Sequence, residues 1–222
     1  ISYSYTGEGF DTGKVVFNMN GADEDIFQKP TYQYFLLSDT QHAEPIEADA
    51  VKNVGAYTLV ATYHGANADN YNTEVEADIQ ISQAPLTLNA LENQNAFYSS
   101  SGTAIQIPQV NGIAQSDVSI ASDLYTLTYS ATYQAPDADE AAPMEDVTAE
   151  TKFYNVGTYQ ITVALALNPG VPGVGNYYAN NVTETYTLTI AKQDQEITLT
   201  PGTGTSWDDG HAGDPDYQIT KT

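Results

Sequence analysis

Two segments of the chain share a short motif and the same alternation of apolar and polar residues. Asn-Val-Gly-Ala-Tyr at 53–57 recurs as Asn-Val-Gly-Thr-Tyr at 155–159, and in both copies apolar side chains then stand at every second position. The positions predicted to face inward are Tyr57, Leu59, Ala61 and Tyr63 in the first copy and Tyr159, Ile161, Val163 and Leu165 in the second. Because a period of two places such residues on one face of a strand, both segments are predicted to be half-buried β-strands.

A second alternating segment follows in each copy, after a loop rich in Gly and Asn that ends in Asn-Tyr, at 65–71 and 168–177. Gly and Asn tolerate the backbone conformations of turns, so these loops are predicted to reverse the chain. The inward positions of the next strands are Val75, Ala77, Ile79 and Ile81 in the first copy and Tyr186, Leu188 and Ile190 in the second. One polar face per strand is typical of an antiparallel sandwich.

Less regular strands are predicted earlier in each copy. Residues 31–36 have a counterpart at 124–133, and Val-Val-Phe at 15–17 parallels Ile-Gln-Ile at 105–107. The spacing of these elements favours seven-stranded sandwiches of about 100 residues each. The predicted fold class is therefore all-β, with tandem immunoglobulin-like antiparallel β-sandwiches.

The repeat predicts three parts of the chain, at 1–84, 85–192 and 193–222. The strand that opens the second part at 86–88 resembles 196–200, whereas the first part has no equivalent and is expected to lack its first strand. The roughly 30 residues of the third part are too few for a sandwich of their own. They are either the start of a further repeat in a longer array or a strand donated to the sheet of a neighbouring subunit.

Composition excludes several classes of function. The 222 residues carry 29 acidic and six basic side chains, a net charge of −23. Neutralising nucleic-acid phosphates or anionic lipids needs clustered Lys and Arg, so neither partner is expected. Cysteine is absent, which excludes disulfides and thiol chemistry. The sequence shows no transmembrane run, so no membrane insertion is expected within this segment.

Candidate catalytic residues do not form a recognisable pattern. The three histidines, His42, His64 and His211, lie in different predicted loops, without the local spacing of a zinc site. No Gly-x-Ser-x-Gly motif occurs, and the carboxylates fall on polar strand faces or in loops. We therefore predict that the chain is not an enzyme.

One acidic segment is a candidate calcium site. In 207–216, Asp208, Asp209, Asp214 and Asp216 lie close to two glycines, and oxygen ligands on a turning backbone suit Ca²⁺. The spacing differs from that of an EF-hand, and a metal-free acidic loop is the other interpretation. No other cofactor is expected.

The repeated motif also resembles a known structural feature. Asn53, Gly55 and Tyr57, with Asn155, Gly157 and Tyr159, look like the corner of immunoglobulin-like sandwiches at which a Tyr hydroxyl bonds back to nearby backbone. The wider pattern adds Tyr-x-Gly early in the repeat and an Ile-ending strand followed closely by Ala or Lys. It resembles the MBG/YDG-type repeats of large bacterial surface proteins. Residues 5–7, 98–102 and 207–210 stand where that family has its Tyr-Asp-Gly element.

The resemblance implies a structural or adhesive repeat region outside the cell, acting as a stalk or spacer. Its partners would be neighbouring repeats or identical subunits, and a host or surface glycan or protein. Two alternatives stay open. The first is an extracellular filament subunit joined by donor-strand complementation, and the second is a carbohydrate-binding module. For the second, most Tyr stand at inward positions, and Tyr178 is one expected to be exposed.

Overall fold

Strands dominate the structure, a computed structural model, and confirm the predicted all-β class. It describes residues 1–15, 30–64, 73–138, 142–148, 150–194, 197–201 and 217–221. The chain divides into two compact units. Unit 1 comprises Ile1–Leu91, Ile107–Ser130 and Thr162–Thr185, and unit 2 comprises Glu92–Gln106, Ala131–Ile161 and Tyr186–Thr222.

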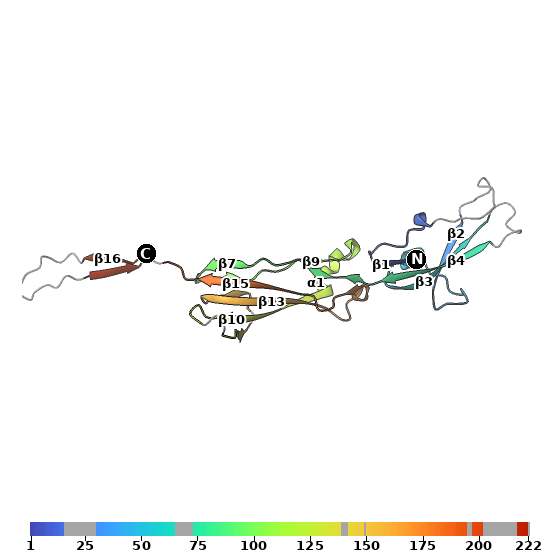
Figure 1. Ribbon diagram of the computed structural model, residues 1–222. Helices are drawn as coiled ribbons and strands as arrows, with labels where there is room; N and C mark the ends of the chain where they lie inside the picture. Colours follow the sequence, from blue (N-terminus) through green and yellow to red (C-terminus); the bar gives the residue numbers. More distant parts are fainter. Residues whose placement is uncertain are drawn as a thin grey trace, which may run out of the picture. The chain divides into compact units, whose positions relative to one another are not determined.

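The first repeat forms a four-stranded sheet of order β1-β4-β3-β2 (Figure 1). Its strands are β1 (Ser2–Ser4), β2 (Thr31–Leu36), β3 (Gly55–Thr62) and β4 (Glu74–Ser82). β1 runs parallel to β4, and the other pairs are antiparallel, with Tyr57 of β3 opposite Ile79 of β4. The motif 53–57 therefore leads into the central strand β3.

The second repeat forms a five-stranded sheet of order β11-β10-β13-β15-β7. Its strands are β7 (Gln94–Phe97), β10 (Tyr125–Gln134), β11 (Glu145–Val147), β13 (Gly157–Leu167) and β15 (Thr183–Ala191). β7 is parallel to β15, as β1 is to β4. In immunoglobulin-like sandwiches the strands called C, F and G are neighbours, and β2-β3-β4 and β10-β13-β15 reproduce that order. The tandem immunoglobulin-like class is confirmed.

Short strand pairs and single helical turns complete the described chain. The parallel pair is β5 (Ala84–Pro85) with β14 (Tyr177–Tyr178). The antiparallel pairs are β6 (Thr87–Leu88) with β9 (Val110–Asn111), β8 (Thr103–Ala104) with β12 (Lys152–Phe153), and β16 (Ile197–Pro201) with β17 (Tyr217–Lys221). The helical segments are η1 (Thr12–Lys14), η3 (Ala48–Ala50), η5 (Gln115–Ile120), α1 (Ala121–Leu124) and η6 (Val174–Asn176).

Inward positions predicted on the second-copy strands are buried. Tyr159, Ile161, Val163 and Leu165 on β13 are buried, as are Tyr186, Leu188 and Ile190 on β15. On β4, Ile79 and Ile81 are buried, but Val75 is exposed. Because Val75 stands at the opposite end of the strand, away from the core that holds Ile79 and Ile81, its predicted inward position is wrong.

Strand β3 is buried on both faces, so its predicted half-buried character is wrong. Thr58 and Val60, on the face opposite Tyr57, are both buried. Thr58 stands opposite the buried Phe35 of β2, and the Phe35 ring packs on the His42 ring with centroids 4.7 Å apart. The segment after β2 thus contributes His42 to the cover over the second face.

Residues 105–107 do not form the predicted strand, and Ile107 is 75% exposed. The Gln106 backbone N–H donates to the Tyr186 hydroxyl, and its side-chain amide donates to the Glu92 carbonyl. These side-chain bonds replace a strand ladder between β8 and β9. The proposed counterpart at 15–17 lies outside the described residues after Val15.

Candidate functional site at the junction of the two sequence repeats

The two tyrosines of the repeated motif make the same backbone hydrogen bond. The Tyr57 hydroxyl donates to the Asn53 carbonyl at 2.9 Å, and the Tyr159 hydroxyl donates to the Asn155 carbonyl at 3.1 Å. Burial raises the pKa of both hydroxyls. The Tyr159 ring also packs against Phe153, with centroids 4.4 Å apart. Each corner therefore ties the start of a central strand to the residues just before it.

The two corner glycines differ. Gly157 has a φ of +147°, and a Cβ there would lie 2.5 Å from the Gln134 carbonyl oxygen. Gly55 has no such backbone angle, and its nearest neighbours are atoms of the Tyr57 side chain. Only the second corner therefore requires glycine for its backbone conformation.

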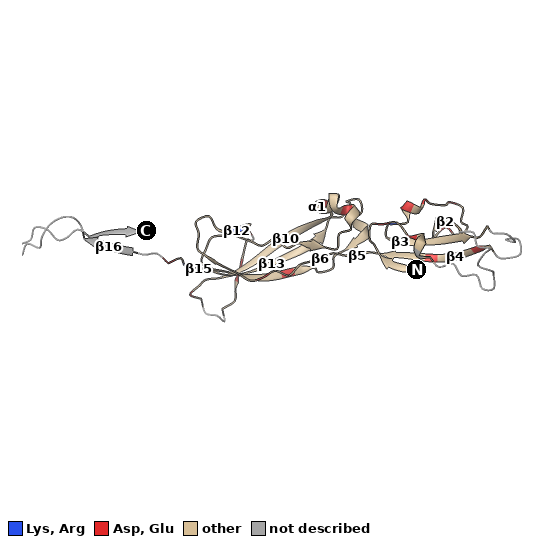
Figure 2. Ribbon diagram, turned by 90° about the horizontal axis from the view of Figure 1, so that it is seen from above, with Lys and Arg blue, Asp and Glu red and all other residues tan. Residues whose placement is uncertain are grey.

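The candidate calcium ligands Asp208, Asp209, Asp214 and Asp216 lie outside the described residues. Within the described residues, no group of three or more His, Asp or Glu side chains could hold a metal ion. Figure 2 marks the described Asp and Glu residues in red on the ribbon. His42 lies 3.5 Å from Glu76, and His64 bonds to Thr31 at 2.8 Å, while His211 is not described.

One carboxylate brings together residues from both sequence repeats. Asp117 of η5 accepts a hydrogen bond from the Tyr5 hydroxyl at 2.9 Å and another from the Tyr177 hydroxyl at 2.6 Å, both on Oδ2. Its other oxygen accepts the Ser116 hydroxyl at 2.9 Å. Tyr5 follows the first strand of the first repeat, whereas the other three residues belong to the second. All lie in unit 1.

The carboxylate is held in its charged form. Burial alone would raise the pKa of Asp117, but the hydrogen bonds from Tyr177, Tyr5 and Ser116, together with the charge of Lys52, outweigh burial and lower it. Burial and the bond to Asp117 raise the pKa of both tyrosines. The cluster therefore keeps one negative charge and two protonated hydroxyls at neutral pH.

The rings of this cluster also pack. Tyr5 and Tyr177 meet edge to face, with centroids 5.4 Å apart at 84°. Such pairs contribute about 0.5–1.5 kcal/mol beyond the area they bury. Gly7 lets the chain approach, because its φ is +80° and a Cβ there would collide with the Ser116 side chain. The Tyr-x-Gly element at 5–7 therefore has a structural role at this junction.

A buried asparagine makes a second link. The Asn176 side chain accepts the Val54 backbone N–H at 2.9 Å through Oδ1 and donates to the Asn53 side chain at 3.2 Å through Nδ2. Asn176 is 7% exposed, and a buried amide without partners would cost about 1–3 kcal/mol. The motif of the first repeat thus contacts the loop-closing Asn-Tyr of the second.

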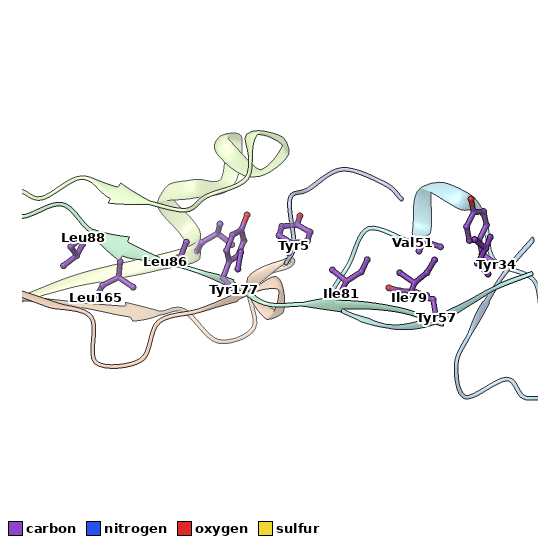
Figure 3. Packing of buried hydrophobic residues seen from close by; sticks show 13 residues of the cluster. Tyr5, Tyr34, Val51, Tyr57, Ile79, Ile81, Leu86, Leu88, Leu165 and Tyr177 are labelled. Atoms are coloured by element: carbon purple, nitrogen blue, oxygen red, sulfur yellow. The ribbon is translucent and has the colours of Figure 1, made fainter. Parts of the chain in front are cut away.

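The connecting segment completes the junction. The Gln83 side chain donates to the carbonyls of Gly175 and Tyr177 at 3.0 and 2.9 Å, and the Leu86 N–H donates to the Tyr178 carbonyl at 2.9 Å. Figure 3 shows buried side chains following one another from Tyr34 through Tyr5 and Tyr177 to Leu165. They belong to one hydrophobic cluster: Tyr5, Tyr34, Val51, Tyr57, Leu59, Ile79, Ile81, Ala84, Leu86, Leu88, Leu124, Leu165 and Tyr177.

The chemistry of the junction is that of a structural connection. Both oxygens of Asp117 already accept hydrogen bonds from protein hydroxyls, which orients the elements that carry those hydroxyls. Sequence reasoning missed Asp117 as a site residue, because η5 lies in a stretch with no repeated pattern. Within the described residues, no helix is long and apolar enough to cross a membrane.

No protein-family model and no curated protein matches this chain. Among solved structures, three N-terminal domains of the bacteriophage RB49 Highly Immunogenic Outer Capsid protein (Hoc) are 11% identical, with a TM-score of 0.32 over 77% of this chain and 59% of that one. Drosophila N-cadherin EC1-3 is 10% identical, with a TM-score of 0.28 over 86% and 64%. The chain spans less than two thirds of each structure. Because both TM-scores are low, neither informs the function of this chain.

Proposed function

We propose that this chain is a non-catalytic spacer or stalk region of an extracellular bacterial surface protein, built from MBG/YDG-type repeats. The observation that carries the proposal is the junction, where Asp117 and Asn176 of the second repeat bind the first. A spacer must hold successive repeats in a fixed relation. A buried, hydrogen-bonded contact with a shared apolar cluster provides that property.

The organisation of the chain is part of this proposal. Residues 1–84 and 85–192 are two repeats, and 193–222 begin a third. The same sheet order and the same corner hydrogen bond in both repeats support this division. The engagement of Asp117 by three protein hydroxyls supports a structural role for this carboxylate at the junction.

The experiment that tests the proposal measures how rigidly the repeats are joined. Residual dipolar couplings are recorded for amides of β2–β4 in the first repeat and of residues 107–130 and 162–185 in the second. In the native chain we expect one alignment tensor to fit both sets. In the double variant Asp117→Ala, Asn176→Ala, we expect two different tensors, because the links to Tyr5 and Val54 are lost.

A matched control keeps the same region and removes an exposed hydroxyl. Tyr178 neighbours Tyr177 but is 40% exposed, so Tyr178→Phe is expected to leave the single tensor unchanged. Two independent tensors in the native chain would contradict a spacer role. A solution mass that rises with concentration would instead support a self-assembling filament, and binding on a glycan array would support a carbohydrate-binding module.

A further inference from the structure

The end of the second repeat carries the same elements that the first repeat uses at the junction. The Tyr5 N–H donates to the Ser82 carbonyl and the Tyr98 N–H to the Ala191 carbonyl, each at 2.8 Å. Each tyrosine is followed by a glycine with positive φ, +80° at Gly7 and +74° at Gly102. Tyr98 is therefore the structural counterpart of Tyr5.

The counterparts differ in exposure. Tyr5 is 6% exposed because it packs on Tyr177 and bonds to Asp117, whereas Tyr98 is 45% exposed. In the part of the chain that the structure describes, the Tyr98 hydroxyl makes no hydrogen bond. Tyr98 is therefore exposed at the end of the second repeat, whereas its counterpart Tyr5 contacts Asp117 and Tyr177 of the neighbouring repeat.

The corner of the second repeat also contains counterparts of the two residues that Asn176 contacts in the first repeat. Asn155 and Val156 correspond to Asn53 and Val54 in the motif, and only the first pair receives Asn176. Among the described residues, neither the Val156 N–H nor the Asn155 side chain has a hydrogen-bond partner. Both groups are available to an amide side chain of another repeat.

One position differs between the two ends. Tyr154 stands where the first repeat has Lys52, and its ring is 46% exposed. The ring lies over Gly102, since a Cβ there would be 2.7 Å from its Cε1 atom. Tyr154 therefore adds an exposed aromatic ring next to Gly102, the glycine that follows Tyr98, and exposed tyrosines are frequent anchors of protein interfaces.

The segment after the second repeat begins with an antiparallel strand pair, β16 with β17, as the second repeat begins with β6 paired to β9. Thr87 of β6 pairs with Asn111 of β9, and its counterpart Thr198 of β16 pairs with Thr220 of β17, each in an antiparallel pair. In the second repeat, β9 leads within a few residues to η5 and Asp117. A repeat that begins at β16 would have, after β17, a segment that corresponds to η5 and carries the counterpart of Asp117.

From these correspondences we infer that the surface formed by Tyr98, Tyr154, Asn155 and Val156 docks a following immunoglobulin-like repeat. That repeat begins at β16 and presents a carboxylate and an amide in the positions of Asp117 and Asn176. The inference rests on the proposed spacer function and names the partner of this surface. We call the surface the distal surface.

The test extends the full chain. Residues 89–192 are placed after Leu199 in place of 200–222, so that β16 leads into a copy of the second repeat as β6 does. Tyr98→Phe is expected to lower the melting temperature of the extended chain by about 3 °C, because a hydrogen bond to a carboxylate is lost, and to leave the 222-residue chain unchanged. An equal effect of Tyr98→Phe in both chains would overturn the inference.

Amide hydrogen exchange gives a second readout. In the extended chain the Val156 N–H is expected to become protected, as the Val54 N–H is, and to lose that protection when the copied Asn176 is replaced by Ala. Tyr5→Phe separates the two proposals. If it lowers the melting temperature while Tyr98→Phe does not, only the distal surface is refuted; if it has no effect, the spacer function fails.

A variant of the chain as it exists covers the case in which the added repeat does not fold. Lys52→Tyr gives the first repeat the distal surface of the second. We expect Tyr5→Phe to remain destabilising in that background. Loss of the Tyr5→Phe effect in the Lys52→Tyr chain would show that such a surface does not accept the contact, and would overturn the inference.

Discussion

The corner tyrosines each stabilise their repeat through one buried hydroxyl. Tyr57→Phe and Tyr159→Phe remove the donor to the Asn53 and Asn155 carbonyls but keep the ring. Each is expected to lower the free energy of unfolding by about 1 kcal/mol, because a hydrogen bond is lost and a carbonyl is left without that donor. Urea unfolding measures this, with Tyr178→Phe as the exposed control; equal values for all three variants would contradict it.

Asp117 makes the stability of the junction depend on pH. Because its pKa is lowered in the folded chain, its contribution is fully present above the unfolded value of about 3.9 and is lost as the pH falls through the folded value. The groups facing it are the Tyr5 and Tyr177 hydroxyls, whose pKa values are raised above their usual value of about 10, and Lys52, whose charge helps to lower the pKa of Asp117.

We therefore expect Asp117→Asn to melt at a lower temperature than the native chain at pH 7 and the difference to shrink below about pH 4. Melting curves between pH 7 and pH 3 measure it. Asp146→Asn, an exposed carboxylate on β11, controls for the general loss of a negative charge. A difference that stays constant over this range would contradict the assignment.

Sequence alone pointed to some of these residues and not to others. The repeated Asn-x-Gly-x-Tyr marks both corners, since the pattern is local. Asp117 is different, because its partners Tyr5 and Tyr177 lie far away in the chain and its neighbours form no repeat. A carboxylate in an acidic chain gives no signal of burial until the fold places hydroxyls around it.

For single elements, the alternation of apolar and polar residues predicted which face of a strand is buried, but it did not predict whether the opposite face is exposed. β13 has the predicted inward residues, but β3 is also buried at Thr58 and Val60 on its other face, where the buried Phe35 of β2 stands opposite Thr58. Residues 105–107 have the apolar-polar-apolar pattern of a strand, yet the N–H of Gln106 bonds to the Tyr186 hydroxyl. Contacts from distant segments decided both cases.

The two corners should respond differently to the same substitution. Gly157→Ala is expected to cost about 1–3 kcal/mol of unfolding free energy, because φ is +147° and the Cβ would lie 2.5 Å from the Gln134 carbonyl oxygen. Gly55→Ala is expected to cost at most about 1 kcal/mol, since only the Tyr57 side chain must shift. Urea unfolding of the two variants measures the difference. Equal costs would show that the corners share one backbone conformation.

For the whole molecule, the repeat predicted two similar parts but not the contact between them. That contact uses Asn176 and Tyr177 from a loop, together with Gln83 from the connecting segment. Loop positions vary in length between the two copies, so their alignment carries no information on which side chains meet across the junction. The sheet order follows from the repeat; the junction follows from tertiary packing.

The net charge of −23 gives the last prediction, at the scale of the whole chain. Unbalanced carboxylates repel one another, and salt screens them over a Debye length of about 10 Å at 0.1 M. Raising NaCl from about 0.01 to about 0.5 M should therefore raise the melting temperature, and Mg²⁺ and Ca²⁺ at matched ionic strength should raise it equally. A larger shift with Ca²⁺, removed by EDTA and absent from Asp208→Asn, Asp209→Asn, would instead support the calcium site predicted at 207–216.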